Sequence, residues 1–128
     1  MSQPSGTTHI TNIRTVGIPV ADQDQAIAFY VGTLGFEERL DIPFGEGVRW
    51  VEVAPAGAAA TLALVRREDG AISIDTGIRL ASGDVQADHD DLRTRGVDVD
   101  AEVIPFPVPM FSFRDPDGNR LVIVANGD

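Results

Sequence analysis

The chain contains one internal repeat with an offset of 61 or 62 residues, and this repeat limits the possible folds more than any other feature. Asp22 is placed to cap a helix that Gly35 ends, and Asp84 and Gly96 take the same places in the second half. A short strand rich in β-branched residues precedes each helix, and three strands follow it. The sequence therefore predicts two βαβββ modules in one chain.

The turn between the last two strands of each module supports the repeat, because both turns have the form X-Pro-X-Gly, at 54–57 and 115–118. The predicted strands are 16–20, 36–42, 48–53 and 61–65, then 78–81, 97–104, 110–114 and 120–124. We expect a frayed tail over 1–11, a first module over 12–67, a polar linker over 68–75 and a second module over 76–126. The predicted fold class is α+β, with the module sheets placed edge to edge as a curved mixed sheet around a concave cleft.

Composition excludes several classes of function. The 128 residues suit one compact domain, and 20 acidic against 10 basic residues give a net charge of −10, which disfavours nucleic acid and anionic membranes as partners. The chain has no Cys and no Lys, so thiolate zinc sites, Cys nucleophiles and Schiff-base lysines are excluded. No apolar run approaches the ~18 residues of a membrane span, and the polar N-terminus does not resemble a signal peptide, so we expect a cytoplasmic protein.

Three segments carry a resemblance to a known family: the 20–30 segment with its Phe29-Tyr30 pair, the following Leu34-Gly-Phe36, and the Asp-Pro-Asp-Gly-Asn turn at 115–119. Together with the repeat, they resemble the vicinal oxygen chelate superfamily, which contains glyoxalase I, bleomycin-resistance proteins, fosfomycin-resistance enzymes and extradiol dioxygenases. The resemblance covers about residues 12–125, and the 45–50 segment is similar to a bacterial subgroup described as glyoxalase-like.

The resemblance also implies where a metal would be held. The four ligand positions of the metal-dependent members fall on Thr15, Thr61, Gly77 (Thr76 if the register slips by one) and Val122. None of these side chains is the imidazole or carboxylate that a divalent metal needs. We therefore expect no metal and no other cofactor, and the metal-dependent chemistries of the superfamily are disfavoured together.

Period-two alternation predicts which residues face the cleft. With Val16, Ile18 and Val20 under the first helix, Thr15, Gly17 and Pro19 face the cleft, as do Trp50 and Glu52 of the third strand and Arg79 of the fifth. The predicted ligand-binding residues are Trp50, Glu52, Arg79, Phe44, Phe111 and Val122, with an aromatic wall and a few polar anchors. The alternative is that Trp50 packs in a core or interface and that Glu52 pairs with Arg79.

Three functions fit these residues. The favoured one is a metal-free protein that binds a small cationic or aromatic molecule, resembles bleomycin-resistance proteins and is a homodimer, as the resemblance and the open sheet edges imply. The second is a glyoxalase-type lyase or isomerase, or a dioxygenase-like enzyme, with a non-standard metal site or none, in which Glu52 is the general base and Arg79 holds a carboxylate or enolate. The third is a regulatory or interaction module without its own ligand.

Two further features have open interpretations. His89 lies on the apolar face of the second predicted helix, which favours a packed histidine over a ligand. The loop at 105–109 alternates three prolines with apolar residues, and it suits a cleft-side lip, a dimer contact or a rigid connector.

Overall fold

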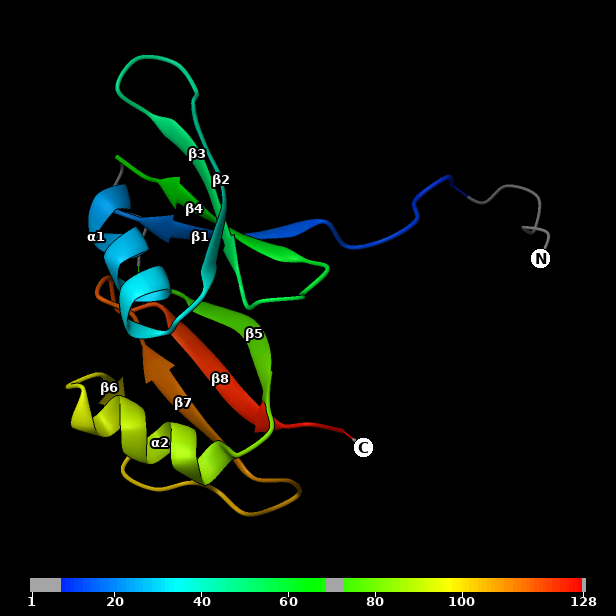
Figure 1. Ribbon diagram of the computed structural model, residues 1–128, viewed down its shortest axis with the longest axis vertical. Helices are drawn as coiled ribbons and strands as arrows, with labels where there is room; N and C mark the ends of the chain where they lie inside the picture. The colour runs from blue at the N-terminus through cyan, green and yellow to red at the C-terminus, as the bar shows by residue number, and fades with distance from the viewer. Residues whose placement is uncertain (1–7, 69–72, 128) are drawn as a thin grey trace.

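The computed structural model describes residues 8–68 and 73–127, and it contains two modules, each a four-stranded mixed sheet with a helical segment (Figure 1). The first module consists of β1 (Thr15–Val20), α1 (Gln23–Ile27), the π-helical turn η1 (Ala28–Thr33), β2 (Glu37–Pro43), β3 (Arg49–Ala54) and β4 (Thr61–Arg66). The second consists of β5 (Asp75–Ser82), α2 (Val85–Thr94), β6 (Asp98–Val99), β7 (Met110–Arg114) and β8 (Arg120–Ala125).

Both sheets have the same strand order, β1-β4-β3-β2 and β5-β8-β7-β6, in which the first and last strands of a module pair in parallel and the other pairs are antiparallel. This equivalence confirms the predicted α+β fold of two βαβββ modules. The two sheets do not share a hydrogen-bonded edge within the described residues, so they are two sheets and not one continuous sheet. The predicted domain boundaries stay predictions, since residues 1–7 of the tail and 69–72 of the linker lie outside the described residues.

The helix signals act as predicted. Asp22 accepts a hydrogen bond from the Gln25 backbone N–H at 3.0 Å, and Asp84 accepts one from that of Ala87 at 3.0 Å. Gly35 and Gly96 end the helical segments with positive φ angles of 83° and 85°. The π-helical continuation from Ala28 to Thr33 was not predicted, and it places Tyr30 inside the molecule.

The predicted strand over 97–104 is wrong in length, because β6 covers only two residues and is followed by a single bridge between Ile104 and Met110. The cause is Asp100, whose carboxylate accepts the Ser112 N–H at 2.9 Å and the Arg114 guanidinium at 3.0 Å. A side chain thus takes a bonding position that the strand backbone would otherwise fill.

Two residues of β1 differ in exposure from what their predicted faces suggest. Val16, on the same face as the buried Ile18 and Val20, is 36% exposed, since it lies at the start of an edge strand. Pro19, on the opposite face, is buried, and its carbonyl accepts a hydrogen bond from Asn119 of the second module at 2.7 Å. The alternation in β5 is as predicted, with Ile78 and Leu80 packed against the core and Arg79 exposed.

One apolar core contains residues of both modules, with Tyr30, Phe111 and Phe113 among its largest side chains. His89 packs in it as predicted, edge-on to Phe111 with ring centroids 4.9 Å apart, and its Nε2 lies 2.7 Å from the Asp100 carbonyl. No helix in the described part of the chain is long and apolar enough to span a bilayer.

Candidate functional site

Glu52 is the centre of a polar cluster on the face of the first sheet that lies opposite the core. Its neighbours along β3, Val51 and Val53, are fully buried in the core, so alternation turns Glu52 to the other face. The Trp50 Nε1–H donates to one carboxylate oxygen at 2.7 Å, and the Thr61 hydroxyl donates to the other at 2.8 Å. Arg14 lies 3.8 Å from the carboxylate, and Glu52 is only 5% exposed.

These contacts lower the pKa of Glu52. The hydrogen bond from Trp50 is the largest cause; burial opposes it, and the Thr61 hydrogen bond and the Arg14 charge add to it. Glu52 is therefore an ionised carboxylate at neutral pH, and hydrogen bonds fix its position. A carboxylate with a lowered pKa and both oxygens engaged is a weak proton acceptor.

Thr15 and Thr61, two of the four positions that the resemblance marks for metal ligands, face each other across the β1–β4 pair. Their hydroxyl oxygens are 2.8 Å apart, and the Thr15 hydroxyl donates to the Thr61 carbonyl at 3.2 Å. Both hydroxyls are thus used within the sheet.

The second module differs from the predicted register. The residue opposite Val122 is Arg79 and not Gly77, because the β5–β8 pairing shifts between Asp75 and Arg79, where Gly77 has a φ of 73°. Thr76, the alternative position, is engaged, since its hydroxyl donates to the Arg120 carbonyl at 2.7 Å. The exposed guanidinium of Arg79 forms no ion pair with the described residues.

The residues at these positions do not fit a divalent metal. Two hydroxyls bonded within the sheet, an apolar valine and a cationic guanidinium offer neither the charge nor the donor atoms required. Among residues 8–68 and 73–127, no group of three His, Asp or Glu side chains is placed to hold an ion. The absence of a metal stays a prediction.

The aromatic wall consists of Trp50 and Phe44, with ring centroids 5.9 Å apart and planes inclined by 58°. Phe44 is 63% exposed and Trp50 is half-buried. Phe111, also predicted for this wall, instead lies in the core at 1% exposure, on the face of β7 opposite to that of Ser112 and Val122. The alternation in β7 was ambiguous because both of its faces carry apolar residues.

The predicted site residues therefore form two groups. Trp50, Glu52 and Phe44 lie on the first module, with Thr15, Thr61 and Arg14, whereas Arg79 and Val122 lie on the second. Within the described residues no hydrogen bond, ion pair or ring contact joins the groups, and the partners of Glu52 are Trp50, Thr61 and Arg14. The sequence analysis missed Arg14, since a residue just before a strand carries no alternation signal.

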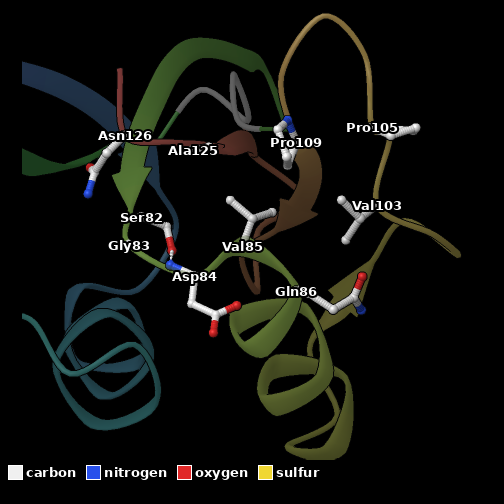
Figure 2. A pocket seen from close by; sticks show the side chains of 10 residues that line it. All are labelled: Ser82, Gly83, Asp84, Val85, Gln86, Val103, Pro105, Pro109, Ala125 and Asn126. Atoms are coloured by element: carbon white, nitrogen blue, oxygen red, sulfur yellow. Dashed lines mark hydrogen bonds between the residues drawn. The ribbon is translucent and has the colours of Figure 1, made fainter. Parts of the chain in front are cut away.

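A cavity of about 600 Å³ lies elsewhere, where α2 begins (Figure 2). Pro105 and Pro109 of the proline loop form one wall, so this loop is the lip of a hollow on the helix side. Three of its polar side chains are already engaged: the Ser82 hydroxyl contacts Asp88 and accepts the Asp84 N–H, Asp84 caps α2, and the Gln86 amide donates to Asp90 at 3.0 Å. We therefore place the candidate site at Trp50 and Glu52.

Comparisons with known proteins agree with this fold. The sequence model of the Glyoxalase/Bleomycin resistance protein/Dioxygenase superfamily matches residues 9–123. The Bacillus subtilis (strain 168) protein YetH is 31% identical over 117 residues, which cover 89% of this chain and 98% of YetH.

Two solved structures extend the comparison. A superfamily member from Sphaerobacter thermophilus DSM 20745 is 35% identical, with a TM-score of 0.84, over 93% of this chain and 100% of that one. TnmS3, an antibiotic binding protein from Streptomyces sp. CB03234, is 35% identical, with a TM-score of 0.81, over 94% of this chain and 100% of that one. On the family match, the sequence identity and the shared fold, the chain belongs to the glyoxalase/bleomycin resistance protein/dioxygenase superfamily.

Proposed function

We propose that this protein binds a small aromatic molecule, preferably a cationic one, against Trp50 and Phe44 on the open face of the first sheet, without a metal. The observation that carries the proposal is the hydrogen bond from the Trp50 indole to the buried Glu52 carboxylate, 2.7 Å long. This bond fixes the indole, so its flat face is preorganised beside the exposed Phe44 ring. The similarity to TnmS3, an antibiotic binding protein, supports the same class of ligand.

Charge supports the preference for a cation. The chain has a net charge of −10, and the lowered pKa of Glu52 keeps a negative charge under the aromatic wall at neutral pH. An aromatic ring whose edge donates to a carboxylate also presents an electron-rich face, which attracts cations. An anionic aromatic molecule of similar size would lack both attractions.

The chemistry of Glu52 favours binding over catalysis. A general base works best when its pKa lies near the working pH, and burial or a like charge is what raises a carboxylate to that range. The hydrogen bonds from Trp50 and Thr61 shift the pKa of Glu52 the other way. A lyase or isomerase that uses Glu52 as its base is therefore the less favoured function.

We also propose that the protein is a homodimer in which a second copy completes the site. Among residues 8–68 and 73–127, β1 and β5 each pair with only one strand and leave an open edge. Packing of the first module against the second module of another copy would bring Arg79 and Val122 to the group around Trp50. Arg79 would then add a second guanidinium donor beside that of Arg14.

The test uses Trp50, the only tryptophan of the chain, as a reporter. Its fluorescence is screened against a library of cationic and aromatic antibiotics, and the affinities of ethidium and of 8-anilinonaphthalene-1-sulfonate are compared by calorimetry. We expect ethidium to bind more tightly and to lose affinity on Phe44→Ala and Glu52→Gln. Phe106→Ala, which removes an 81% exposed ring on the proline loop, is the matched control and should change nothing.

Three results would overturn the proposal: no response to the library or to ethidium, tighter binding of the anionic probe, or equal losses in Phe106→Ala and Phe44→Ala. Elemental analysis of the purified protein measures its metal content, and a stoichiometric transition metal would contradict the proposal that the ligand binds without a metal. Sedimentation equilibrium measures the dimer, and a monomer that binds ethidium in full would contradict the shared site.

A further inference from the structure

The first sheet divides at one end, and a side chain from α1 fills the division. β3 pairs with β4 only at Glu52–Ala63 and Val53–Leu62. Beyond this point Arg49, Trp50 and Val51 pair only with β2, while Leu64 and the residues after it pair only with β1. Residues 41–51, here called the arm, are therefore a two-stranded hairpin without further sheet contacts on the β4 side, and the arm projects past the sheet in Figure 1.

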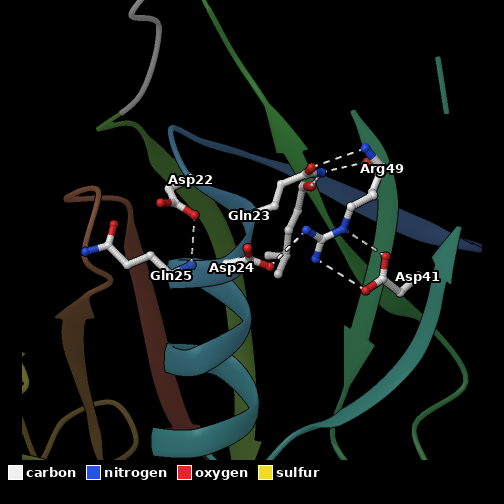
Figure 3. Close-up of polar contacts among 7 residues, drawn as sticks. Asp22, Gln23, Asp24, Gln25, Asp41 and Arg49 are labelled. Carbon is white, nitrogen blue, oxygen red and sulfur yellow. Dashed lines mark hydrogen bonds and ion pairs between the residues drawn. The ribbon is translucent and has the colours of Figure 1, made fainter. Parts of the chain in front are cut away.

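Gln23, the first residue of α1, occupies the gap. Its Nε2 donates to the Arg49 carbonyl at 2.6 Å and to the Leu64 carbonyl at 2.9 Å, and its Oε1 accepts the Arg49 N–H at 3.3 Å (Figure 3). The residue is only 6% exposed. One amide thus satisfies two carbonyls, one on each side of the gap, which as two acceptors cannot bond to each other.

The Arg49 side chain adds a second anchor for the same point of the arm. It lies 2.8 Å from Asp24 of α1 and 3.0 Å from Asp41 of the facing strand (Figure 3). These ion pairs are partly solvated, whereas the Gln23 side chain is buried, so the amide is the stronger constraint. Both anchors act directly beside Trp50.

We propose that Gln23 is a positioning residue: through the backbone of Arg49 it holds the arm, and thereby Trp50 and Phe44, in the orientation that forms the aromatic wall. The role of this wall in ligand binding rests on the proposed function, but the positioning itself does not. Without the amide, the arm is a hairpin tethered mainly by exposed ion pairs, and such hairpins open locally. Gln23 then determines whether the wall is formed before a ligand arrives.

The first experiment uses the native protein without a ligand. In NMR spectra, the two Gln23 side-chain amide protons should exchange slowly with solvent and have shifts unlike those of Gln25, an exposed glutamine in the same helix. Equal shifts and equally fast exchange for the two glutamines would overturn the proposal, because the amide would then not be held between the strands.

The second experiment compares Gln23→Met, which keeps the length of the side chain and removes its donors, with the matched control Gln25→Met. We expect Gln23→Met to lose hydrogen-exchange protection over 41–51 and to increase acrylamide quenching of Trp50, with protection in β7 and β8 retained. Gln25→Met should resemble the native protein. Asp24→Asn, which breaks only the exposed ion pair, should have a smaller effect on the same amides.

Two outcomes contradict this role. If protection is lost equally over both sheets, Gln23 is a general stability residue; if Gln23→Met leaves the arm unchanged, it is not an anchor. The ligand is tested separately with ethidium: a loosened arm in a protein whose native form does not bind ethidium would refute the proposed function and leave the positioning role intact. Native affinity in a variant with a loosened arm would refute the preformed wall.

Discussion

Tyr30 and Asp115 join the two modules through a buried hydrogen bond, in which the Tyr30 hydroxyl donates to Oδ2 of Asp115 at 2.8 Å. The two residues belong to the two most recognisable motifs of the sequence, the Phe-Tyr pair and the Asp-Pro-Asp-Gly-Asn turn. Asp115 also accepts the backbone N–H groups of Asp117 and Asn119, at 2.9 Å each, and the Asn119 side-chain amide at 3.0 Å. The motifs therefore meet as one contact that sets the placement of the modules.

Tyr30→Phe should lower the free energy of unfolding by about 1.5–3 kcal/mol, the usual range for a hydrogen bond to a charged group. The ring stays in the core, so the loss comes from the hydroxyl and from the Asp115 oxygen left with fewer donors. Denaturant unfolding measures the change, and a double-mutant cycle with Asp115→Asn isolates the pair. A coupling energy near zero would show that the contact does not hold the modules together.

Alkaline pH should reveal the same bond. Burial, followed by the charge and hydrogen bond of Asp115, raises the pKa of Tyr30 well above its ordinary value of 10.0. Only the unfolded chain releases this proton readily above pH 10, so the stabilising contribution is complete below that pH and decreases by up to about 1.4 kcal/mol per pH unit above it.

The measurement is the absorbance at 295 nm, which reports the single tyrosine of the chain. We expect no phenolate signal until the protein unfolds, and the two transitions should coincide. The Tyr30→Phe protein is the control for other groups that titrate at high pH. A reversible phenolate titration near pH 10 in a folded protein would contradict the predicted shift.

The module repeat could be predicted because its signals are local. Asp22, Asp84, Gly35 and Gly96 determine where helices begin and end by contacts within a few residues, and the structure reproduces them. Two of the site residues, Trp50 and Glu52, followed from alternation beside the buried Val51 and Val53.

The features that sequence reasoning missed depend on contacts between distant segments. In the sequence, Gln23 looks like an ordinary residue of a first helical turn. It connects Arg49 of β3 with Leu64 of β4 only because the two strands diverge at this end. The register shift between Asp75 and Arg79 places Arg79 opposite Val122, and a simple offset between modules cannot reveal such a shift. Phe111 was misplaced because a strand with two apolar faces gives no alternation.

Asn119→Asp should destabilise the protein severely, by about 3 kcal/mol or more. The Asn119 amide nitrogen donates to the Pro19 carbonyl and to Asp115, and the side chain is fully buried. Aspartate would replace this donor with an acceptor that faces a carbonyl and a carboxylate. Asn126→Asp, at an exposed position after β8, makes the same chemical change and should have little effect. Similar unfolding midpoints for the two variants would contradict the role of Asn119.

Acid pH should reveal how much ionised Glu52 contributes to the free energy of unfolding. Its pKa in the folded protein lies below the ordinary value of 4.5, mainly because Trp50 donates a hydrogen bond to it. The contribution to stability is therefore complete above pH 4.5 and is lost as the pH falls through the lowered value, where the folded protein must also take up the proton. Glu52→Gln should be less stable than the native protein at pH 7, and the difference should shrink steadily below pH 4.5.

Denaturant unfolding followed through Trp50 fluorescence tests this prediction between pH 7 and pH 3, and the difference between the two proteins cancels the titration of the other carboxylates. Glu46→Gln, at an exposed position in the same hairpin, is the matched control, and its difference from the native protein should stay small throughout. The native protein should also change its Trp50 emission as Glu52 takes up its proton, because the indole then donates to a neutral group. A difference between native protein and Glu52→Gln that grows as the pH falls from 7 toward 4.5 would mean that the pKa of Glu52 is raised, and it would restore Glu52 as a candidate general base.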